Sequence, residues 1–233
     1  TTVATTSFHM REFLTLACER TGGTRADSLY MLHDFGYRGT SSEESAARGG
    51  AAHLLHFAGT DTLVAMRLLQ HYFGASVEGL AGSVAASEHS IMTSLGPYGE
   101  LNLARRIIAK HQNQIVSLVA DSYNYKEFVW AMIRKAELVR RCGVSLVIRP
   151  DSCPPDLPTP EDVVVWTLNT LKEGLPTTIT STGHVVTAFK VLWGDGIGPE
   201  GIKRIVNAAS RDGFAAQNLV FGMGGGLLQK GNR

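Results

Sequence analysis

Short, continuously apolar runs alternate with segments of helical period along this chain, and this alternation constrains the fold more than any other feature. Apolar residues recur three and four positions apart in the segment 125–141, as in a helix with one buried face. The apolar runs do not alternate with polar residues, which is typical of parallel strands covered on both faces. We therefore expect an α/β fold with a parallel sheet, either open or closed into a barrel.

The same patterns give the expected elements. We expect strands at 53–57, 115–120, 145–149, 188–193 and 219–222. We expect helices at 6–20, 41–49, 61–72, 87–95, 99–110, 125–141, 160–172 and 199–212. The proline-rich stretch 153–160 is interpreted as a rigid loop that leads into a helix, and no repeat or linker divides the chain. One domain is expected to span residues 1–233.

Composition excludes several classes of protein. The formal net charge is +1, which gives no broad basic face for nucleic acid or anionic lipid. Hydrophobic residues make up 44% of the chain, enough for a sizeable core, and no apolar run approaches the roughly 20 residues of a membrane span. The three cysteines have neither disulfide-framework nor metal-site spacing. We expect a cytoplasmic protein with no nucleic-acid partner and no membrane association.

Polar and glycine residues follow the expected strands, where parallel α/β folds build their sites. Asp121, Asp151 and Asp195 each come shortly after such a run. Carboxylates that converge at one edge can accept hydrogen bonds from ribose hydroxyls or hold Mg²⁺. Any one of them alone is more often a simple helix cap.

The other candidate residues also have an ordinary structural interpretation. The glycine run 222–226 follows the last expected strand and can surround a phosphate with N–H groups, or it can form a tight, closely packed turn. Arg38 and Arg149 suit a diphosphate, although a single arginine is usually a structural ion pair. His89 is a possible catalyst, although a single histidine is more often a packed or capping residue.

Seven segments taken together resemble one known family. They are LHDFGYRG (32–39), FAGTDT (57–62), SEHS (87–90), DSY (121–123), IRPDS (148–152), GDG (194–196) and FGMGGGLLQK (221–230). In this order they resemble the nicotinamide-using members of the nicotinate/nicotinamide phosphoribosyltransferase family. The resemblance covers nearly the whole chain.

The resemblance implies a reaction and its partners. Nicotinamide and 5-phosphoribosyl 1-diphosphate would give nicotinamide mononucleotide and diphosphate in NAD salvage, with Mg²⁺ as cofactor and ATP as an optional coupled substrate. It also implies a distorted parallel β/α barrel of the type II phosphoribosyltransferase kind, incomplete here at both ends. A homodimer with a composite active site is implied as well.

The resemblance also implies residue roles. Catalytic roles go to His89, Arg149 and Asp151, and His89 would be phosphorylated when ATP hydrolysis is coupled to synthesis. Mg²⁺ would be held by Asp121 and Asp151. Diphosphate contacts would come from Arg38, His89 and Arg149, and nicotinamide contacts from Phe35, Arg38, Asp61, Ser83 and Ser117. Phosphoribosyl contacts would come from Asp121, Arg149, Asp151, Gly194, Asp195, Gly224, Gly225 and Arg233.

Asp61 bears on which base is used. A carboxylate suits the amide N–H₂ of nicotinamide and repels the carboxylate of nicotinic acid, so we expect Asp61→Ser to relax selectivity. Two alternatives stay open: a nicotinate phosphoribosyltransferase, and a non-catalytic homologue that binds nucleotide.

Three departures from the family pattern stand out. Residues 153–155 are Cys-Pro-Pro where the family has a Gly-Asn-type turn, which leaves the path of that loop open. Met223 replaces a small residue within the glycine run. The family pattern also extends beyond both ends, so we expect the 233 residues to be an internal fragment that turns over poorly or not at all.

Overall fold

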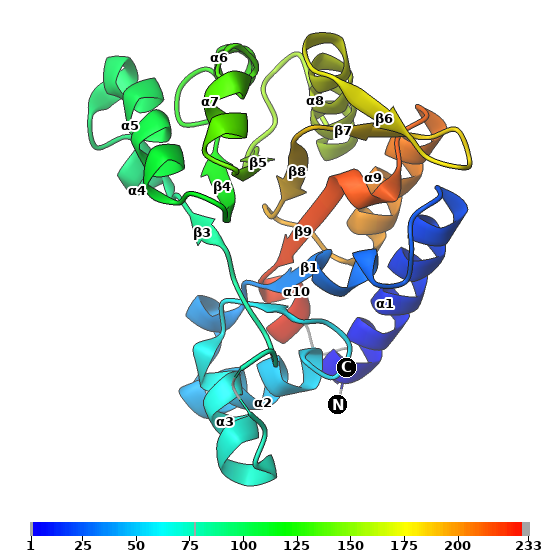
Figure 1. Cartoon of the computed structure of the whole chain (residues 1–233). Coiled ribbons are helices and arrows are strands. Elements are labelled where there is room, and N and C mark those ends of the chain that lie inside the picture. Colours follow the sequence, from blue (N-terminus) through cyan, green and yellow to red (C-terminus); the bar gives the residue numbers. More distant parts are fainter. Residues whose placement is uncertain (1, 77, 230–233) are drawn as a thin grey trace.

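A curled parallel sheet forms the centre of the molecule. The computed structural model describes residues 2–76 and 78–229. Within these residues the sheet has seven parallel strands in the order β2-β1-β9-β8-β5-β4-β3 (Figure 1). The strands are β1 (Leu32–Asp34), β2 (Gly59–Thr60), β3 (Ala85–Ala86), β4 (Ile115–Val119), β5 (Ser145–Arg149), β8 (Lys190–Trp193) and β9 (Leu219–Met223). The expected α/β fold with a parallel sheet is confirmed, and the sheet has the form of a half-barrel.

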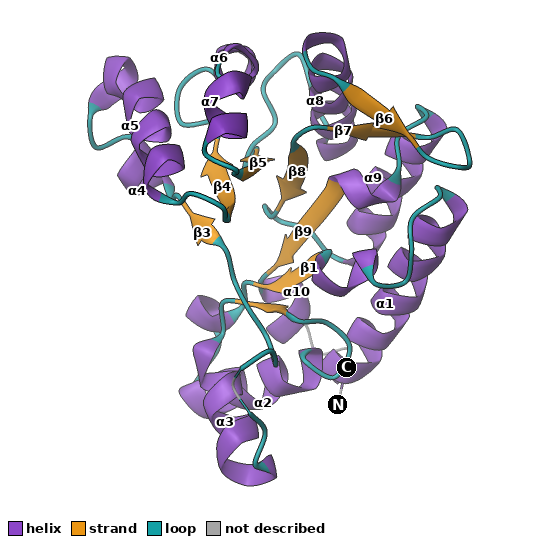
Figure 2. Ribbon diagram, in the orientation of Figure 1, coloured by secondary structure: helices purple, strands orange, loops and turns teal. Residues whose placement is uncertain are grey.

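Helices surround the outer side of this sheet, and α2 and α3 pack on each other in a lobe at the bottom of the view (Figure 2). A separate antiparallel hairpin pairs β6 (Thr177–Ile179) with β7 (Val185–Thr187). Among the described residues no helix is long and apolar enough to cross a bilayer. The helices are α1 (Thr2–Arg20), α2 (Glu43–His53), α3 (Leu63–Phe73), α4 (His89–Met92), α5 (Gly96–Lys110), α6 (Tyr125–Arg134), α7 (Ala136–Arg141), α8 (Pro160–Gly174), α9 (Pro199–Arg211) and α10 (Gly225–Leu228).

The strands that the sequence predicts best are those with long apolar runs. Val116 and Leu118 of β4 and Ile148 of β5 are fully buried, as expected for strands covered on both faces. The expected strand at 145–149 matches β5, and those at 115–120, 188–193 and 219–222 differ from β4, β8 and β9 by one or two residues. The helix that begins at Pro160 is also confirmed; Thr159 caps it through a reciprocal hydrogen-bond pair with Asp162.

Two expectations are wrong. The run 53–57 is not a strand: His53 ends α2, the next residues turn, and β2 begins only at Gly59. The apolar side chain of Phe57 instead stacks on the His53 ring, with centroids 5.1 Å apart. The segment 125–141 is two helices, because Lys135 (φ −101°, ψ 8°) leaves the helical conformation between α6 and α7.

His53 makes the stability of the fold depend on pH. Its ring is fully buried, with Nδ1 3.0 Å from Ser7 Oγ, and burial lowers the pKa of His53 to about 4. Between pH 4 and roughly 6.5 the unfolded chain therefore binds more protons at this site, so this residue makes the free energy of unfolding rise with pH by about 3 kcal/mol. Urea unfolding at pH 4.5 and 7 is expected to show a smaller pH dependence in His53→Gln than in the wild type. The exposed His71→Gln is the control, and an equal pH dependence in all three proteins would contradict the assignment.

Candidate functional site

The carboxyl ends of the described parallel strands bring the candidate residues to one edge of the sheet. This follows from the topology, because parallel strands in one sheet all end on the same side. The residues that follow the strands are Phe35 after β1, Asp61 after β2, His89 after β3, Asp121 after β4, Asp151 after β5, Asp195 after β8 and Gly224 after β9.

Two adjoining hollows open at this edge. One has a volume of about 570 Å³ and the other about 430 Å³. Phe35, Arg38 and Arg149 line both hollows, so these side chains form a shared wall. Asp61 lines the smaller hollow. The larger hollow is also lined by Asp151, Gly194, Asp195, Gly224 and Gly225.

Arg149 is the most constrained cation of the site. The residue is only 8% exposed. Its Nη2 donates to Asp151 Oδ1 (3.1 Å) and its Nη1 lies 3.5 Å from Glu88 Oε1. The guanidinium carbon lies 5.6 Å from the centroid of the Phe35 ring. A planar fork fixed in this way presents charge and N–H donors to the hollows without first having to be ordered.

His89 lies between two carboxylates. Its Nε2 is 3.1 Å from Asp121 Oδ1, and its Nδ1 is 4.0 Å from Asp151 Oδ2. Ser152 Oγ donates to Asp121 Oδ2 in a short hydrogen bond. The Asp121 side chain is 6% exposed, whereas that of His89 is 41% exposed. The carboxylates therefore fix the ring orientation while the ring remains accessible.

The donor set for Mg²⁺ is small. Among the described residues, no group of three or more His, Cys, Asp and Glu side chains is arranged to hold a metal ion. Both oxygens of Asp121 already have partners, and Asp151 Oδ1 accepts from Arg149. Mg²⁺ at phosphate sites commonly uses one or two protein carboxylates and completes its shell with phosphate oxygens and water. The residues fit Mg²⁺ in that form, with Asp151 as the more available ligand.

Asp61 is held by Ser83, whose Oγ donates to Asp61 Oδ1 at 2.5 Å. Ser83 also lines a cavity of about 480 Å³, together with His33 and Ser117. Ser117 Oγ is buried and has no hydrogen-bond partner among the described residues. Burial lowers the pKa of His33, which keeps its ring neutral near pH 7. This cavity therefore combines apolar walls with the Ser117 hydroxyl, to which a ligand could form a hydrogen bond.

The glycine run 222–226 lines a hollow at some positions and packs closely at others. Gly224 and Gly225 line the larger hollow, where their N–H groups lie at the start of the short helix α10. Gly226 is required for packing, because a Cβ there would lie 2.7 Å from the carbonyl oxygen of Ile197. The buried Met223 accepts a hydrogen bond from Phe35 N (3.1 Å) through its carbonyl. The expected phosphate contact Arg233 lies outside the described residues.

Some residues of the site have no clear signal in the sequence. Glu88 and Ser152 lie beside predicted residues, but only the folded chain pairs them with Arg149 and Asp121. Asp34 is fully buried at the end of β1 and accepts from Gly36 N (2.8 Å), which holds the turn after Phe35.

Glu100 on α5 is a further buried carboxylate near Asp121. Burial, reinforced by Asp121, raises the pKa of Glu100 to about 7. Between roughly pH 4.5 and 7 the folded state therefore binds more protons at this site, so its contribution to stability falls as pH rises. We expect Glu100→Gln to raise the melting temperature at pH 8 by more than at pH 5. Exposed Glu173→Gln is the control, and a pH-independent difference would contradict the inference.

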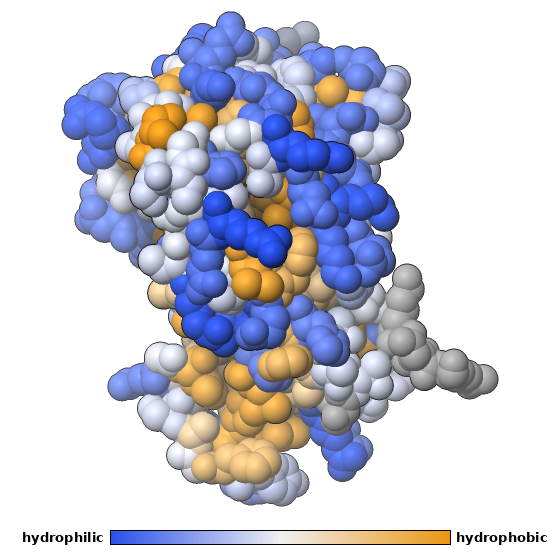
Figure 3. Space-filling model, turned by 90° about the vertical axis from the view of Figure 1, so that its right-hand side faces the viewer, coloured by the Kyte–Doolittle hydropathy of each residue, from blue (hydrophilic) through white to orange (hydrophobic). Residues whose placement is uncertain are grey.

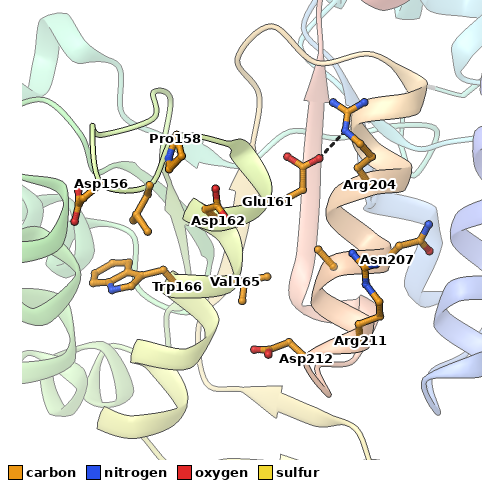
Figure 4. A pocket seen from close by; sticks show the side chains of 12 residues that line it. Asp156, Pro158, Glu161, Asp162, Val165, Trp166, Arg204, Asn207, Arg211 and Asp212 are labelled. Carbon is orange, nitrogen blue, oxygen red and sulfur yellow. Dashed lines mark hydrogen bonds and ion pairs between the residues drawn. The ribbon is translucent and has the colours of Figure 1, made fainter.

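A larger hollow lies elsewhere. It has a volume of about 850 Å³ and lies between α8 and α9 on the outer surface (Figure 4). Two of its charged groups pair with each other, since Arg204 Nε lies 2.6 Å from Glu161 Oε1. None of the predicted site residues lines this hollow. We therefore assign the candidate site to the strand ends.

The fold and the site together define an α/β protein whose parallel strands end at hollows lined by arginines, carboxylates and glycines. Comparison with protein families then gives the particular group: residues 30–233 match the model of the nicotinate phosphoribosyltransferase (NAPRTase) family, and the chain belongs to that family.

Several curated proteins are similar to the chain. A nicotinamide phosphoribosyltransferase of Xanthomonas campestris pv. campestris is 38% identical over 239 residues, covering 100% of this chain and 49% of the relative. Proteins of the same name from Mycoplasma pneumoniae and Acinetobacter baylyi are each 32% identical, covering 98% and 96% of this chain. These two matches cover 51% and 48% of the relatives, so the chain spans about half the length of the proteins that it resembles.

Proposed function

We propose that this chain carries a site for transfer of the phosphoribosyl group from 5-phosphoribosyl 1-diphosphate to nicotinamide, giving nicotinamide mononucleotide and diphosphate in NAD salvage. The observation that carries the proposal is the shared wall of Phe35, Arg38 and Arg149 between a hollow that contains Asp61 and a hollow lined by glycines and carboxylates. Family membership and the names of the relatives support the same reaction.

The base occupies the hollow that contains Asp61. The Phe35 ring offers a stacking face, and Asp61 accepts a hydrogen bond from the carboxamide N–H₂. Ser83 already donates to one oxygen of Asp61, which orients the carboxylate and leaves Oδ2 for the base. Ser117 supplies a further hydroxyl from the cavity of about 480 Å³ that Ser83 also lines.

The sugar and its phosphates occupy the glycine-lined hollow. Asp151 and Asp195 accept hydrogen bonds from ribose hydroxyls, and backbone N–H groups of Gly194, Gly224 and Gly225 approach the 5′-phosphate. Asp121 acts through its contact with His89. The carboxylates also stabilise positive charge that develops on the ribose ring.

Departure of diphosphate is the step that needs cations. When the bond between C1′ and the diphosphate breaks, its electron pair goes to the leaving oxygen, and the base nitrogen forms the new bond at C1′. Arg38 and Arg149 stabilise the leaving charge, so catalysis needs positioned charges more than a protein nucleophile. Asp151 and Asp121 are the residues that would hold Mg²⁺, which when bound would supply further positive charge to the diphosphate.

His89 is the proposed acceptor of a phosphoryl group when ATP is used as a coupled substrate. The His89 side chain is 41% exposed, so a phosphoryl donor can reach the ring, and Asp121 and Asp151 hold the orientation of the ring. In the proposed arrangement His89 also contacts the diphosphate.

The wider assembly is also part of the proposal. We infer a type II phosphoribosyltransferase barrel, which the curled parallel sheet supports, and a cytoplasmic enzyme. Apolar surface gathers on the lower lobe in Figure 3, the lobe that α2 and α3 form. Leu63, Tyr72 and Phe73 of α3 are each more than half exposed, as is Leu55 just after α2. This surface supports a homodimer, and we infer that its active site is composite.

The test is direct measurement of nicotinamide mononucleotide after the chain is mixed with nicotinamide, 5-phosphoribosyl 1-diphosphate and Mg²⁺, with nicotinic acid in parallel. The expected result for a chain about half the length of its relatives is slow formation of nicotinamide mononucleotide, with little or no product from nicotinic acid. Product mainly from nicotinic acid would favour the nicotinate reaction instead. Binding of both substrates without diphosphate release would favour a non-catalytic homologue, and absence of binding would contradict the proposal.

A further inference from the structure

Three residues in one row of the sheet form an unusual arrangement beside the proposed base pocket. His33 on β1 is paired with Gly59 on β2 and with Gly222 on β9. Side chains in one row of a parallel sheet point to the same face. The two glycines therefore leave space on that face on both sides of His33.

Two aromatic rings occupy this space. A Cβ built on Gly59 would lie 2.7 Å from Cγ of His33, and a Cβ built on Gly222 would lie 2.0 Å from Cε2 of Phe35. Neither glycine has a positive φ, so each is needed for space rather than for a special backbone conformation. The centroids of the two rings are 6.2 Å apart.

Phe35 is constrained on several sides. Its backbone N–H donates to Met223 O (3.1 Å), which fixes the Cα next to β9. Its ring lies against Gly222, and a Cβ on Gly194 would be 3.4 Å from the same ring. The guanidinium carbon of Arg149 is 5.6 Å from the ring centroid. A side chain at position 222 would therefore move the Phe35 ring toward Arg149 and into the hollows.

We propose that Gly222 is a positioning residue that acts through Phe35: its missing side chain provides the seat of the aromatic ring and so sets the depth of the base pocket. The role in the base pocket rests on the proposed function, which identifies the base. The packing of Phe35 on Gly222 is independent of the proposed function.

The functional test is Gly222→Ala. Because an error of about 1 Å in placing a binding group can cost up to about 100-fold, we expect the KM for nicotinamide to rise by about tenfold or more. The KM for 5-phosphoribosyl 1-diphosphate is expected to rise by less, because Phe35 also lines the larger hollow but Gly224 and Gly225 themselves are unchanged. Gly198→Ala is the matched control, because a Cβ there meets no atom within 4 Å. Equal KM changes for the two substrates would overturn the proposal.

A double-mutant cycle on thermal unfolding tests the packing without any need for turnover. We expect Gly222→Ala to lower the melting temperature in the wild type and to lower it much less in a Phe35→Ala background. If Gly222→Ala lowers the melting temperature equally in the two backgrounds, Gly222 does not act through Phe35, even if the chain is active. A clear coupling in a chain that binds neither substrate would support the packing of Phe35 on Gly222 while contradicting the proposed function.

Discussion

Arg149→Ala is expected to weaken binding of 5-phosphoribosyl 1-diphosphate by about 10- to 100-fold, the range expected when hydrogen bonds to a charged group are lost. Arg149 is 8% exposed and lines both hollows of the site. Its loss removes a charged fork from the diphosphate and leaves Asp151 and Glu88 without their cation. The two carboxylates would then repel the anionic substrate. Titration calorimetry with substrate and Mg²⁺ measures the effect.

Two further variants separate charge from geometry. Arg149→Lys keeps the charge but lacks the planar fork, so we expect an intermediate loss of affinity. Arg140→Ala removes an exposed arginine that pairs with Glu137 on the surface, and we expect unchanged affinity. Melting temperatures establish that each variant is folded. If folded Arg149→Ala binds the substrate as tightly as the wild type, the role of Arg149 in the diphosphate site is wrong.

Asp61→Ser is expected to lower the preference for nicotinamide over nicotinic acid by about 10- to 100-fold, which corresponds to roughly 1.4–2.7 kcal/mol. The wild-type carboxylate accepts a hydrogen bond from the amide of nicotinamide and repels the carboxylate of nicotinic acid. Its removal therefore weakens binding of nicotinamide and allows nicotinic acid to bind. The ratio of kcat/KM values for the two bases measures the preference, and the ratio of their dissociation constants measures it without turnover.

Ser83→Ala is the matched variant for Asp61. It removes the hydrogen bond to Asp61 Oδ1 but keeps the negative charge, so we expect a smaller change in preference than in Asp61→Ser. A preference for the amide that is unchanged in Asp61→Ser would show that selectivity comes from another part of the site.

The sequence predicts the fold best where secondary structure is decided locally. The runs that form β4 (IVSLV) and β5 (SLVIR) are mainly apolar, and an aspartate follows each of them closely, so both the strands and Asp121 and Asp151 could be identified. The strand β2 has only two residues, Gly59 and Thr60, which pair because β1 lies beside them. No local pattern marks such a strand, which is one reason why the neighbouring run 53–57 was a plausible alternative.

The contacts within the site were less predictable than the residues themselves. Glu88 and Arg149 are 61 residues apart in sequence, and their pairing depends on the order of strands in the sheet. The same holds for the contact between Ser152 and Asp121, which joins the ends of neighbouring strands β4 and β5. Local periodicity predicts the strands but not their order, whereas family resemblance gave the set of residues without these pairings.

The position of β9 has a consequence for how the chain folds. It is the last described strand in sequence, yet it lies between β1 and β8 inside the sheet. Pairing between β1 and β9 brings together residues about 190 positions apart, a long-range contact of the kind that forms slowly. During synthesis the earlier strands must remain open to admit this late segment. The packing of Phe35 on Gly222 and the glycine loop are therefore expected to form together in a late step of folding. The ability to bind ligand would then show that the whole sheet has formed.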